Sequence, residues 1–254
     1  PQEIVWVGPD HQLPSQYNGV EGQTFVGKIL LPQLVDCHTH LVFGGDRSHE
    51  YSMRLNGADY QEIAAAGGGI LHTMAETQKL SSNDLLQLAK ERVERIHSYG
   101  VGTIEVKSGY GLDQDTELRM LRAARALEAR RNVRIRTSFL GAHAVPPEFS
   151  GHPDAYIDEV CIPALKAAAA EGLVDAVDGF CEGIAFDTAQ IARVFDAAKA
   201  LNLPVKLHAE QLSNIGSTRL AAKYGALSAD HVEHATEDDV RALADADIQE
   251  SMKW

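Results

Sequence analysis

The stretch Leu34-Val35-Asp36-Cys37-His38-Thr39-His40 joins a short apolar run to two histidines that stand two positions apart. Side chains at positions i and i+2 of a β-strand point to the same face, so both imidazoles are expected on one side of a strand end. Two neutral imidazoles placed side by side form a chelate for a divalent transition metal. A His-x-His pair without further context is more often two surface or hydrogen-bonded histidines than a metal site. Evidence from the rest of the chain is therefore needed to choose between these interpretations.

From Leu34 onward, apolar runs alternate with amphipathic helical windows. The apolar runs are Leu34–Cys37, Val101–Val106, Val133–Leu140, Val174–Phe180, Val205–Leu207 and Leu227–Val232. The helical windows lie near residues 83–98, 115–130, 155–171, 187–201, 214–224 and 237–245. Ser82 is expected to cap the first helix, and Thr236-x-x-Asp239 to form a capping box on the last. Six strand–helix units in a row predict a parallel sheet covered by helices.

Polar groups follow the apolar runs, and this pattern favours a closed barrel over an open doubly wound sheet. The groups are Cys37-His38-Thr39-His40, Glu105-Val106-Lys107, Gly141-Ala142-His143, Phe180-Cys181-Glu182, Lys206-Leu207-His208-Ala209-Glu210 and Ala229-Asp230-His231. In a (β/α)8 barrel, the C-terminal ends of the strands deliver residues to one pocket. Residues 32–254 are therefore predicted to form an α/β domain of (β/α)8 type.

The predicted barrel is incomplete, because only six of its eight strand–helix units are visible. The chain stops at Ser251-Met252-Lys253-Trp254, where a seventh strand is expected to begin, so we expect a C-terminally truncated sequence. Residues 1–31 are predicted to be the remnant of a small β-subdomain. Its short strands are expected at Ile4–Val7 and Thr24–Val26, where Gly and Pro residues follow each apolar run.

The composition narrows the class of protein. A formal net charge of −13 over 254 residues argues against a nucleic-acid partner, which needs a basic surface. Three widely spaced cysteines, Cys37, Cys161 and Cys181, suit buried thiols in a reducing cytoplasm better than a disulfide framework. No apolar stretch approaches the roughly 20 residues that span a bilayer, and no secretory signal is visible, although the chain opens at Pro1 and not at Met. The sequence predicts a cytoplasmic protein without a membrane partner.

Two further histidines end later strands on the same predicted face. His208 follows the fifth apolar run and His231 ends the sixth. A catalytic metal is held by three protein ligands and keeps one open position for water. His38, His40 and His208 supply three nitrogens, which indicates a metal-dependent hydrolase, and zinc and iron both suit imidazole ligands.

Longer motifs in the chain resemble one family. Val35-Asp36-Cys37-His38-Thr39-His40 matches the pattern with which the amidohydrolase superfamily opens its barrel. The stretches that resemble imidazolonepropionases in particular are Leu41-Val42-Phe43-Gly44-Gly45-Asp46-Arg47, Lys107-Ser108-Gly109-Tyr110-Gly111-Leu112, Gly141-Ala142-His143-Ala144-Val145-Pro146, Leu207-His208-Ala209-Glu210-Gln211 and Ser228-Ala229-Asp230-His231. They occur in the same order as in the family and cover nearly the whole chain.

The resemblance implies hydrolytic opening of the cyclic amide of 4-imidazolone-5-propanoate to N-formimidoyl-L-glutamate, a step of histidine degradation, with one zinc or iron ion. The roles that it implies are metal binding by His38, His40 and His208, catalysis by His231 beside the attacking water, and substrate contacts by Arg47, Tyr110, His143 and Gln211. The family's remaining metal ligand, an aspartate at the end of the eighth strand, has no counterpart in the sequence.

The implied roles agree with side-chain chemistry. A guanidinium is the best complement of the substrate's carboxylate, and Arg47 stands on the loop that leaves the first strand. His231 is able to relay a proton near neutral pH. Gln211 can hydrogen-bond the ring but cannot act as a base, so the general base stays open between His231, Glu210 and a carboxylate missing from the chain.

Three neighbouring features are expected to take no part in the chemistry. His234 lies three residues beyond His231 and is expected to be structural. Lys107 ends an early strand and is not expected to bridge metal ions. Gly67-Gly68-Gly69 lacks the Lys-Ser/Thr of a phosphate-binding loop, and we expect a flexible loop near the pocket rim there.

Two other functions stay open. Another amidohydrolase, such as a deaminase of a nucleobase-like ring, would share the metal site but not need Arg47 and Tyr110 for a propionate group. A non-catalytic metal-binding fragment would hold an ion without turnover. The expected partner is a small molecule with a carboxylate. The oligomeric state is open, although relatives tend to be homodimers.

Overall fold

The computed structural model describes residues 4–58, 62, 68–128 and 133–251 of the 254-residue chain. The chain divides into two units, Pro1–Pro32 and Gln33–Trp254. The first unit contains two short 3-10 helices, η1 at Asp10–Gln12 and η2 at Ser15–Tyr17.

The strands predicted for the first unit at Ile4–Val7 and Thr24–Val26 are wrong. Over residues 4–32 the described backbone forms no β-strand. A short strand is stable only when it pairs with others and buries one face. All apolar side chains of both segments except the half-buried Trp6 stay exposed instead, so hydrophobic burial does not stabilise an extended pairing here.

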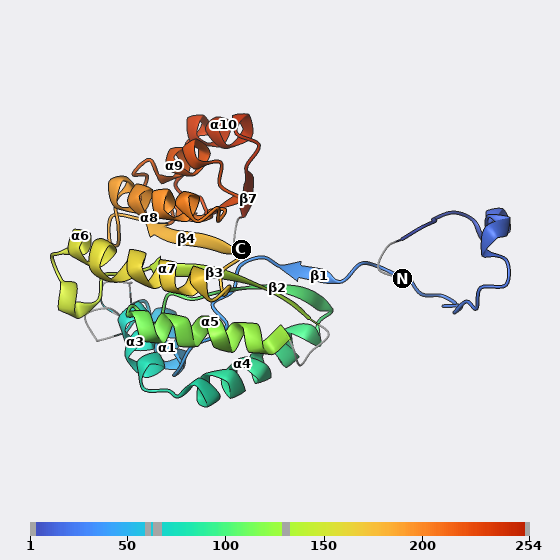
Figure 1. The fold of residues 1–254 in the computed structure, drawn as a ribbon, viewed down its shortest axis with the longest axis horizontal. Helices are drawn as coiled ribbons and strands as arrows, with labels where there is room; N and C mark the ends of the chain where they lie inside the picture. Colours follow the sequence, from blue (N-terminus) through green and yellow to red (C-terminus); the bar gives the residue numbers. More distant parts are fainter. Residues whose placement is uncertain (1–3, 59–61, 63–67, 129–132, 252–254) are drawn as a thin grey trace. The chain divides into compact units, whose positions relative to one another are not determined.

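Seven parallel strands of the second unit lie side by side in the order of the chain (Figure 1). They are β1 (Leu34–Asp36), β2 (Val101–Lys107), β3 (Arg134–Ala142), β4 (Ala176–Cys181), β5 (Leu207–Ala209), β6 (Ser228–His231) and β7 (Gln249–Ser251). Each strand pairs in parallel with the next one. Among the described residues, β1 and β7 have one partner strand each, so the predicted incomplete (β/α) barrel is confirmed.

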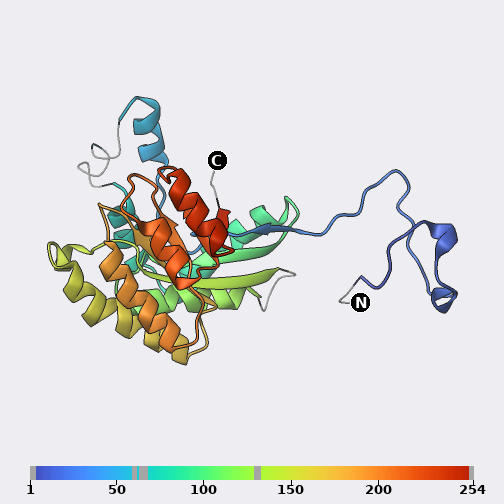
Figure 2. The same ribbon diagram turned by 90° about the horizontal axis from the view of Figure 1, so that it is seen from above.

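Helices connect the strands and pack against the sheet, with α4, α5 and α7 running along β2 to β4 (Figures 1 and 2). The helices are α1 (Ser48–Leu55), α3 (Ile70–Gln78), α4 (Ser82–His97), α5 (Gln114–Glu128), α6 (Pro153–Tyr156), α7 (Ile162–Ala170), α8 (Thr188–Ala200), α9 (Ser217–Tyr224) and α10 (Glu237–Asp245). A 3-10 turn, η3 (Pro147–Phe149), precedes α6, and a π-helical turn, η4 (Ile157–Cys161), joins α6 to α7.

Local capping signals fix the helix ends. The box predicted at Thr236 and Asp239 is present at the start of α10. Helix α4, however, is capped by Ser81 and not by Ser82. Both serines offer a hydroxyl, but only Ser81 has a carboxylate three residues later, on Asp84, which completes the reciprocal pair of hydrogen bonds.

Helices α1 and α3 were not predicted, and strand β7 begins at Gln249, slightly before the point at Ser251 where a seventh strand was expected. Helix α1 is polar and mostly exposed, so it carries no apolar periodicity that would reveal it. Gly69 leads directly into α3, whereas Gly67 of the predicted loop lies outside the described residues. Strand β7 begins at Gln249 although its sequence is polar, because pairing with β6 supplies its backbone hydrogen bonds.

Two clusters of buried apolar side chains stabilise the second unit. The larger one lies among α7, α8 and the later strands and includes Phe186, Phe195 and Leu165, which are fully buried. The smaller one lies among α4, α5 and β2 and includes Leu85 and Leu127. These cores hold the strands rigidly, so that the residues at their C-terminal ends keep fixed positions.

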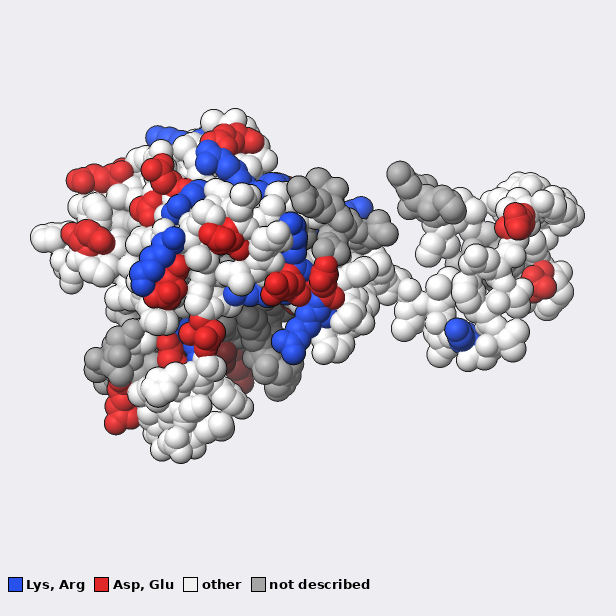
Figure 3. Space-filling view, turned by 90° about the horizontal axis from the view of Figure 1, so that it is seen from below, with Lys and Arg blue, Asp and Glu red and all other residues white. Residues whose placement is uncertain are grey.

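The surface of the second unit mixes charges of both signs. The face drawn in Figure 3 carries acidic and basic side chains next to one another. Ion pairs such as Arg122–Glu171 and Arg193–Asp154 join neighbouring helices at 2.6 Å. Within the described part of the chain, every helix is too short or too polar to cross a membrane.

Candidate functional site

A pocket of about 450 Å³ opens at the C-terminal ends of the strands. Its walls contain all eight residues that the sequence analysis singled out: His38, His40, Arg47, Tyr110, His143, His208, Gln211 and His231. Residues so distant in the chain meet here because parallel strands of a barrel present their C-terminal ends at one mouth. Their position is as expected, while their chemical roles stay predictions.

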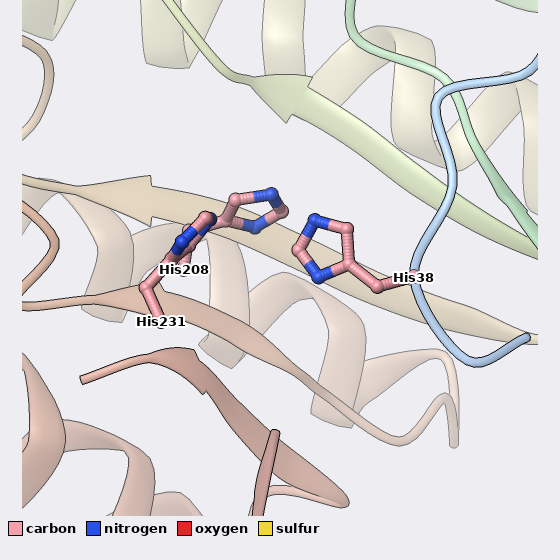
Figure 4. A group of neighbouring side chains, drawn as sticks. All are labelled: His38, His208 and His231. Carbon is pink, nitrogen blue, oxygen red and sulfur yellow. The ribbon is translucent and has the colours of Figure 1, made fainter. Parts of the chain in front are cut away.

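Three imidazoles converge in this pocket from separate parts of the chain (Figure 4). His38 follows β1, His208 lies in β5 and His231 ends β6. One potential ligand atom from each residue lies within 4.8 Å of the others. The rings of His38 and His208 are turned towards one another, with their centroids 4.5 Å apart.

His40 stands beside this group and has the spacing of a metal ligand. Its Nε2 atom lies 3.4 Å from Nε2 of His208. Two zinc–nitrogen bonds of about 2.0–2.1 Å at a tetrahedral angle place the nitrogens roughly 3.3 Å apart. The buried Nδ1 of His40 has no hydrogen-bond partner among the described residues.

The His-x-His stretch follows β1 instead of lying within it, because β1 ends at Asp36. The strand-like course continues even so, since the backbone N–H of Lys107 donates to the carbonyl of Thr39 at 2.9 Å. This bond keeps the stretch alongside β2. Both His38 and His40 therefore still line the pocket.

Two buried aspartates orient the imidazoles from below. Nδ1 of His38 lies 2.7 Å from Oδ2 of Asp230, and Nδ1 of His208 lies 3.1 Å from Oδ2 of Asp178. A carboxylate that accepts the Nδ1 proton of a histidine fixes its tautomer and directs the Nε2 lone pair away. In both residues the carboxylate therefore holds Nδ1, and Nε2 is the ring nitrogen on the side away from it.

Burial keeps the imidazoles of His40 and His208 neutral at neutral pH, because it lowers the pKa of each. Burial lowers the pKa of His208 to about 3, against the opposing charge of Asp178. Burial, aided by the neighbouring histidines, also lowers the pKa of His40 well below its ordinary value. Neutral imidazoles are the form that binds metal ions, so the donor set fits a divalent transition metal.

His231 is held in a strained backbone conformation. Its φ angle is +81° and that of Val232 is +58°, in the left-handed region that non-glycine residues rarely adopt. Strain of this kind persists where surrounding structure imposes it and is concentrated at functional sites. It turns the ring of His231 towards the pocket, 5.3 Å from the ring of His208.

Arg47 is positioned by a buried carboxylate that the sequence analysis missed. The Nε atom of Arg47 donates to Oε2 of Glu50 at 2.7 Å, and Oε1 of Glu50 accepts the backbone N–H of Gly69 at 2.8 Å. Glu50 lies only one turn into α1, yet it is 7% exposed. The two terminal nitrogens of the guanidinium are the donors that suit a bidentate carboxylate.

Tyr110 stands on a loop that Glu117 holds from inside. The buried Glu117 carboxylate accepts the backbone N–H groups of Gly109, Gly111 and Leu112 at distances from 2.7 to 3.1 Å. Gly109 has a φ of +105°, which glycine adopts without strain. Its carbonyl bonds Nδ1 of His143 at 2.8 Å, so the tyrosine loop and His143 form one unit.

Glu210 is directed away from the pocket, although the sequence left it open as a general base. Its carboxylate bonds the backbone N–H of Gly216 and the hydroxyl and N–H of Thr218 at the start of α9. Gln211, the next residue, does line the pocket. Of the two candidates within this chain, His231 lines the pocket and Glu210 does not.

Only some of the carboxylates that support the site were within reach of sequence reasoning, among them Asp230, which stands within the run Leu227–Val232. Asp178 interrupts the apolar run Val174–Phe180, which is a signal of a buried polar function. Glu50 and Glu117 lie in polar helical segments where carboxylates are usual, and nothing in the local pattern marks them. Only tertiary contacts reveal what they hold.

No family model matches the chain, but individual proteins do. It is 63% identical over 242 residues to an imidazolonepropionase of Roseobacter denitrificans, which covers 95% of this chain and 61% of the relative. An imidazolonepropionase of Ruegeria pomeroyi is 60% identical over 244 residues, and one of Brucella anthropi is 54% identical over 244 residues. The chain spans about three fifths of the length of these curated relatives.

Solved structures with low sequence identity share the fold. An adenine deaminase from Arthrobacter aurescens superposes with a TM-score of 0.60 at 14% identity, covering 87% of this chain and 72% of that one. A 5-methylcytosine deaminase from Klebsiella pneumoniae gives a TM-score of 0.61 at 16% identity, covering 86% of this chain and 53% of that one. An ochratoxinase of A. niger gives a TM-score of 0.60 at 16% identity, covering 96% of this chain and 57% of that one.

The fold is an incomplete (β/α) barrel similar to the barrels of these deaminases and of the ochratoxinase, with an imidazole cluster at the C-terminal ends of its strands. Within that fold class, the sequence similarity is specific. The chain is similar in sequence to imidazolonepropionases and spans about three fifths of their length.

Proposed function

We propose that the chain carries the metal centre and substrate pocket of an imidazolonepropionase. The reaction is the hydrolysis of the cyclic amide of 4-imidazolone-5-propanoate to N-formimidoyl-L-glutamate in histidine degradation. The observation that carries the proposal is the convergence of His38, His40 and His208 in one pocket that also contains Arg47. The identity of more than half of the residues with named imidazolonepropionases supports it.

His38, His40 and His208 would hold one divalent ion, for which zinc and iron are both suited by their affinity for imidazole. When bound, such an ion lowers the pKa of water and polarises a carbonyl oxygen. The chain's own contribution is to present the three Nε2 atoms in fixed directions. The aspartates behind His38 and His208 provide this orientation.

Arg47 would bind the propionate of the substrate. Its Nε is held by Glu50, and its terminal nitrogens remain as a fork that matches a carboxylate. This contact would place the ring between Tyr110 and the imidazoles, where His143 and Gln211 also line the pocket. The carboxylate thus supplies binding energy at one end while the amide is positioned at the other.

His231 would move the proton. In the hydrolysis, water adds its oxygen to the ring carbonyl carbon, the carbon–nitrogen bond breaks, and a proton has to reach the leaving nitrogen. His231 stands beside His38 and His208 with ring centroids 5.4 and 5.3 Å away. It accepts the proton from water and returns it to the nitrogen, as a general base and then a general acid.

Turnover of 4-imidazolone-5-propanoate tests the proposal, with N-formimidoyl-L-glutamate measured by mass spectrometry. Two forms are compared: this chain, and this chain joined to the C-terminal part of the Roseobacter denitrificans relative that it does not span. We expect turnover in the joined form and a drop of at least tenfold on Arg47→Ala. The exposed Arg122→Ala serves as the control.

Three outcomes would contradict the proposal or part of it. Ammonia release from cytosine or guanine without ring opening of the imidazolone would identify a nucleobase-type deaminase. Bound metal without turnover in either form would identify a non-catalytic metal-binding protein. Equal activity of the wild type and Arg47→Ala would remove Arg47 from the substrate site.

A further inference from the structure

Beneath the imidazoles lies a buried cluster of charges centred on Lys107. The Nζ atom of Lys107 lies 2.6 Å from Oδ2 of Asp178 and 3.2 Å from Oδ2 of Asp230. A carboxylate oxygen of Glu105 lies 3.2 Å away as well. The ammonium group is therefore surrounded by three carboxylates that come from β2, β4 and β6.

All members of this cluster are removed from water. Lys107, Asp178 and Asp230 are 0% exposed, and Glu105 is 7% exposed. Burial alone lowers the pKa of a lysine, but here the charges of Asp178, Glu105 and Asp230 raise the pKa of Lys107 above its ordinary value. The ammonium is thus the permanent internal counterion of Asp178, and it shares Glu105 and Asp230 with Lys206.

The cluster has the composition of a metal site. Donor atoms of Asp178, His208 and Asp230 lie within 4.8 Å of one another, which is a spacing that suits a bound cation. Carboxylate oxygens favour hard ions such as Mg²⁺ and Mn²⁺, whereas imidazoles favour zinc and iron. A hard cation is already present at this position, in the form of the Lys107 ammonium.

We infer that the ammonium of Lys107 fills a carboxylate-lined cation position beneath the imidazoles and keeps divalent ions out of it, so that the pocket holds a single metal ion. The inference rests on the proposed metal centre, because it concerns what lies directly below it. It assigns to Lys107 a role in metal stoichiometry and not in bridging two ions. The same aspartates then remain available to orient His38 and His208.

The neighbouring Lys206 does not fill this position. Its Nζ bonds Oε2 of Glu105 at 2.7 Å and the carbonyl of Cys37 at 3.0 Å, and it lies 3.7 Å from Asp230. Asp178 therefore pairs with Lys107 and not with Lys206. Removal of Lys206 therefore provides a matched control, because it deletes a buried ammonium next to the same cluster.

The test counts Zn²⁺ and Mn²⁺ per chain after equilibrium dialysis against both ions, using elemental analysis and the paramagnetic resonance signal of Mn²⁺. We expect the wild type, Lys107→Arg and Lys206→Ala to take up zinc without Mn²⁺. Lys107→Ala is expected to bind about one additional Mn²⁺, since it loses the internal cation and opens space for a hard ion. Adding Asp178→Asn to Lys107→Ala should abolish the Mn²⁺ signal.

A folded Lys107→Ala protein that takes up no Mn²⁺ would overturn the inference. Should this variant unfold without metal, its thermal unfolding is measured with added Mn²⁺. Recovery of the folded state with bound Mn²⁺ supports the inference, and failure to recover overturns it. The zinc content of the wild type is read in the same dialysis, so an absent imidazole site would be recognised separately from an absent carboxylate site.

Discussion

Nδ1 of His38 lies 2.7 Å from Oδ2 of Asp230, although 192 positions separate the two residues in the sequence. The bond connects the segment that follows β1 to β6 and so crosses the open barrel. Burial raises the pKa of the Asp230 carboxyl, but its hydrogen bond to His38 and the charge of Lys107 outweigh burial and lower the pKa below its ordinary value. The carboxylate is therefore a constant acceptor for the imidazole proton.

We expect Asp230→Asn to weaken zinc binding by about 10- to 100-fold, the range found when a carboxylate behind a metal-binding histidine is lost. The amide cannot accept the imidazole proton through both of its terminal atoms, so the direction of the His38 ring is less well fixed. Competition with a chelator of known affinity measures the effect. Asp158→Asn is the control, since Asp158 pairs with Arg193 at the surface. Unchanged zinc affinity in a folded Asp230→Asn protein would remove Asp230 from this role.

Glu50→Gln is expected to weaken the binding of carboxylate ligands by roughly tenfold, which corresponds to about 1.4 kcal/mol. The glutamine keeps the volume of Glu50 but replaces one of the two oxygens that accept from Arg47 and Gly69. Calorimetric titration with imidazole-4-propanoate, a ligand with the same propionate group, measures the dissociation constant. Glu76→Gln, at a half-exposed pair with Lys79, should leave that constant unchanged. An equal effect of both substitutions would point to net charge and not to the positioning of Arg47.

The sequence predicted the elements that have a simple hydrophobic period. Six of the strands and the long helices follow from alternating apolar runs and amphipathic windows, and the polar residues after the runs predicted where the pocket lies. His38 and His208 could be placed together on this basis, because the C-terminal ends of parallel strands meet at one mouth.

The remaining features depend on tertiary contacts that leave no local pattern. Helix α1 is polar, and it is located by contacts such as that of Glu50 with Gly69. Glu117 sits in a helix where carboxylates are common, and its function appears only when the loop of Tyr110 folds over it. The strands predicted at Ile4–Val7 and Thr24–Val26 failed for the opposite reason, since β-propensity without a partner strand does not produce a sheet.

The stability of the metal-free protein is expected to fall as the pH decreases from 6.5 to about 4. Burial lowers the pKa of His143 to about 4, whereas the unfolded chain has the ordinary value of 6.5. Between these values the unfolded state binds more protons than the folded state, so acid favours unfolding. The difference between the two pKa values of His143 corresponds to a loss of about 3 kcal/mol in the free energy of unfolding.

Urea unfolding in the presence of a chelator, at several pH values, measures this dependence. His143→Asn removes the titrating ring and retains a side-chain N–H that can donate to the carbonyl of Gly109. The loss of stability between pH 6.5 and 4 should be smaller in this variant than in the wild type. Identical slopes in the two proteins would show that His143 is not kept neutral by burial.

Glu117 gives the strongest prediction for stability, because one carboxylate satisfies three backbone N–H groups of the Tyr110 loop. Glu117→Ala leaves these donors buried without an acceptor, at about 1–3 kcal/mol for each, so a loss of at least about 3 kcal/mol is expected. Glu117→Gln retains one acceptor oxygen in the same volume, and a loss of about 1 kcal/mol is expected. Urea unfolding at neutral pH measures the free energy of unfolding of both variants.

The matched control for these two variants is Glu128→Ala, because Glu128 is an exposed carboxylate at the end of the same helix. Its free energy of unfolding is expected to change by no more than about 0.5 kcal/mol. The order of the Tyr110 loop is measured by hydrogen exchange at the N–H groups of Gly109, Gly111 and Leu112. These amides should lose protection in Glu117→Ala and keep most of it in Glu117→Gln. Retained protection in the alanine variant would mean that other contacts, such as that between Gly109 and His143, are sufficient to hold the tyrosine in place.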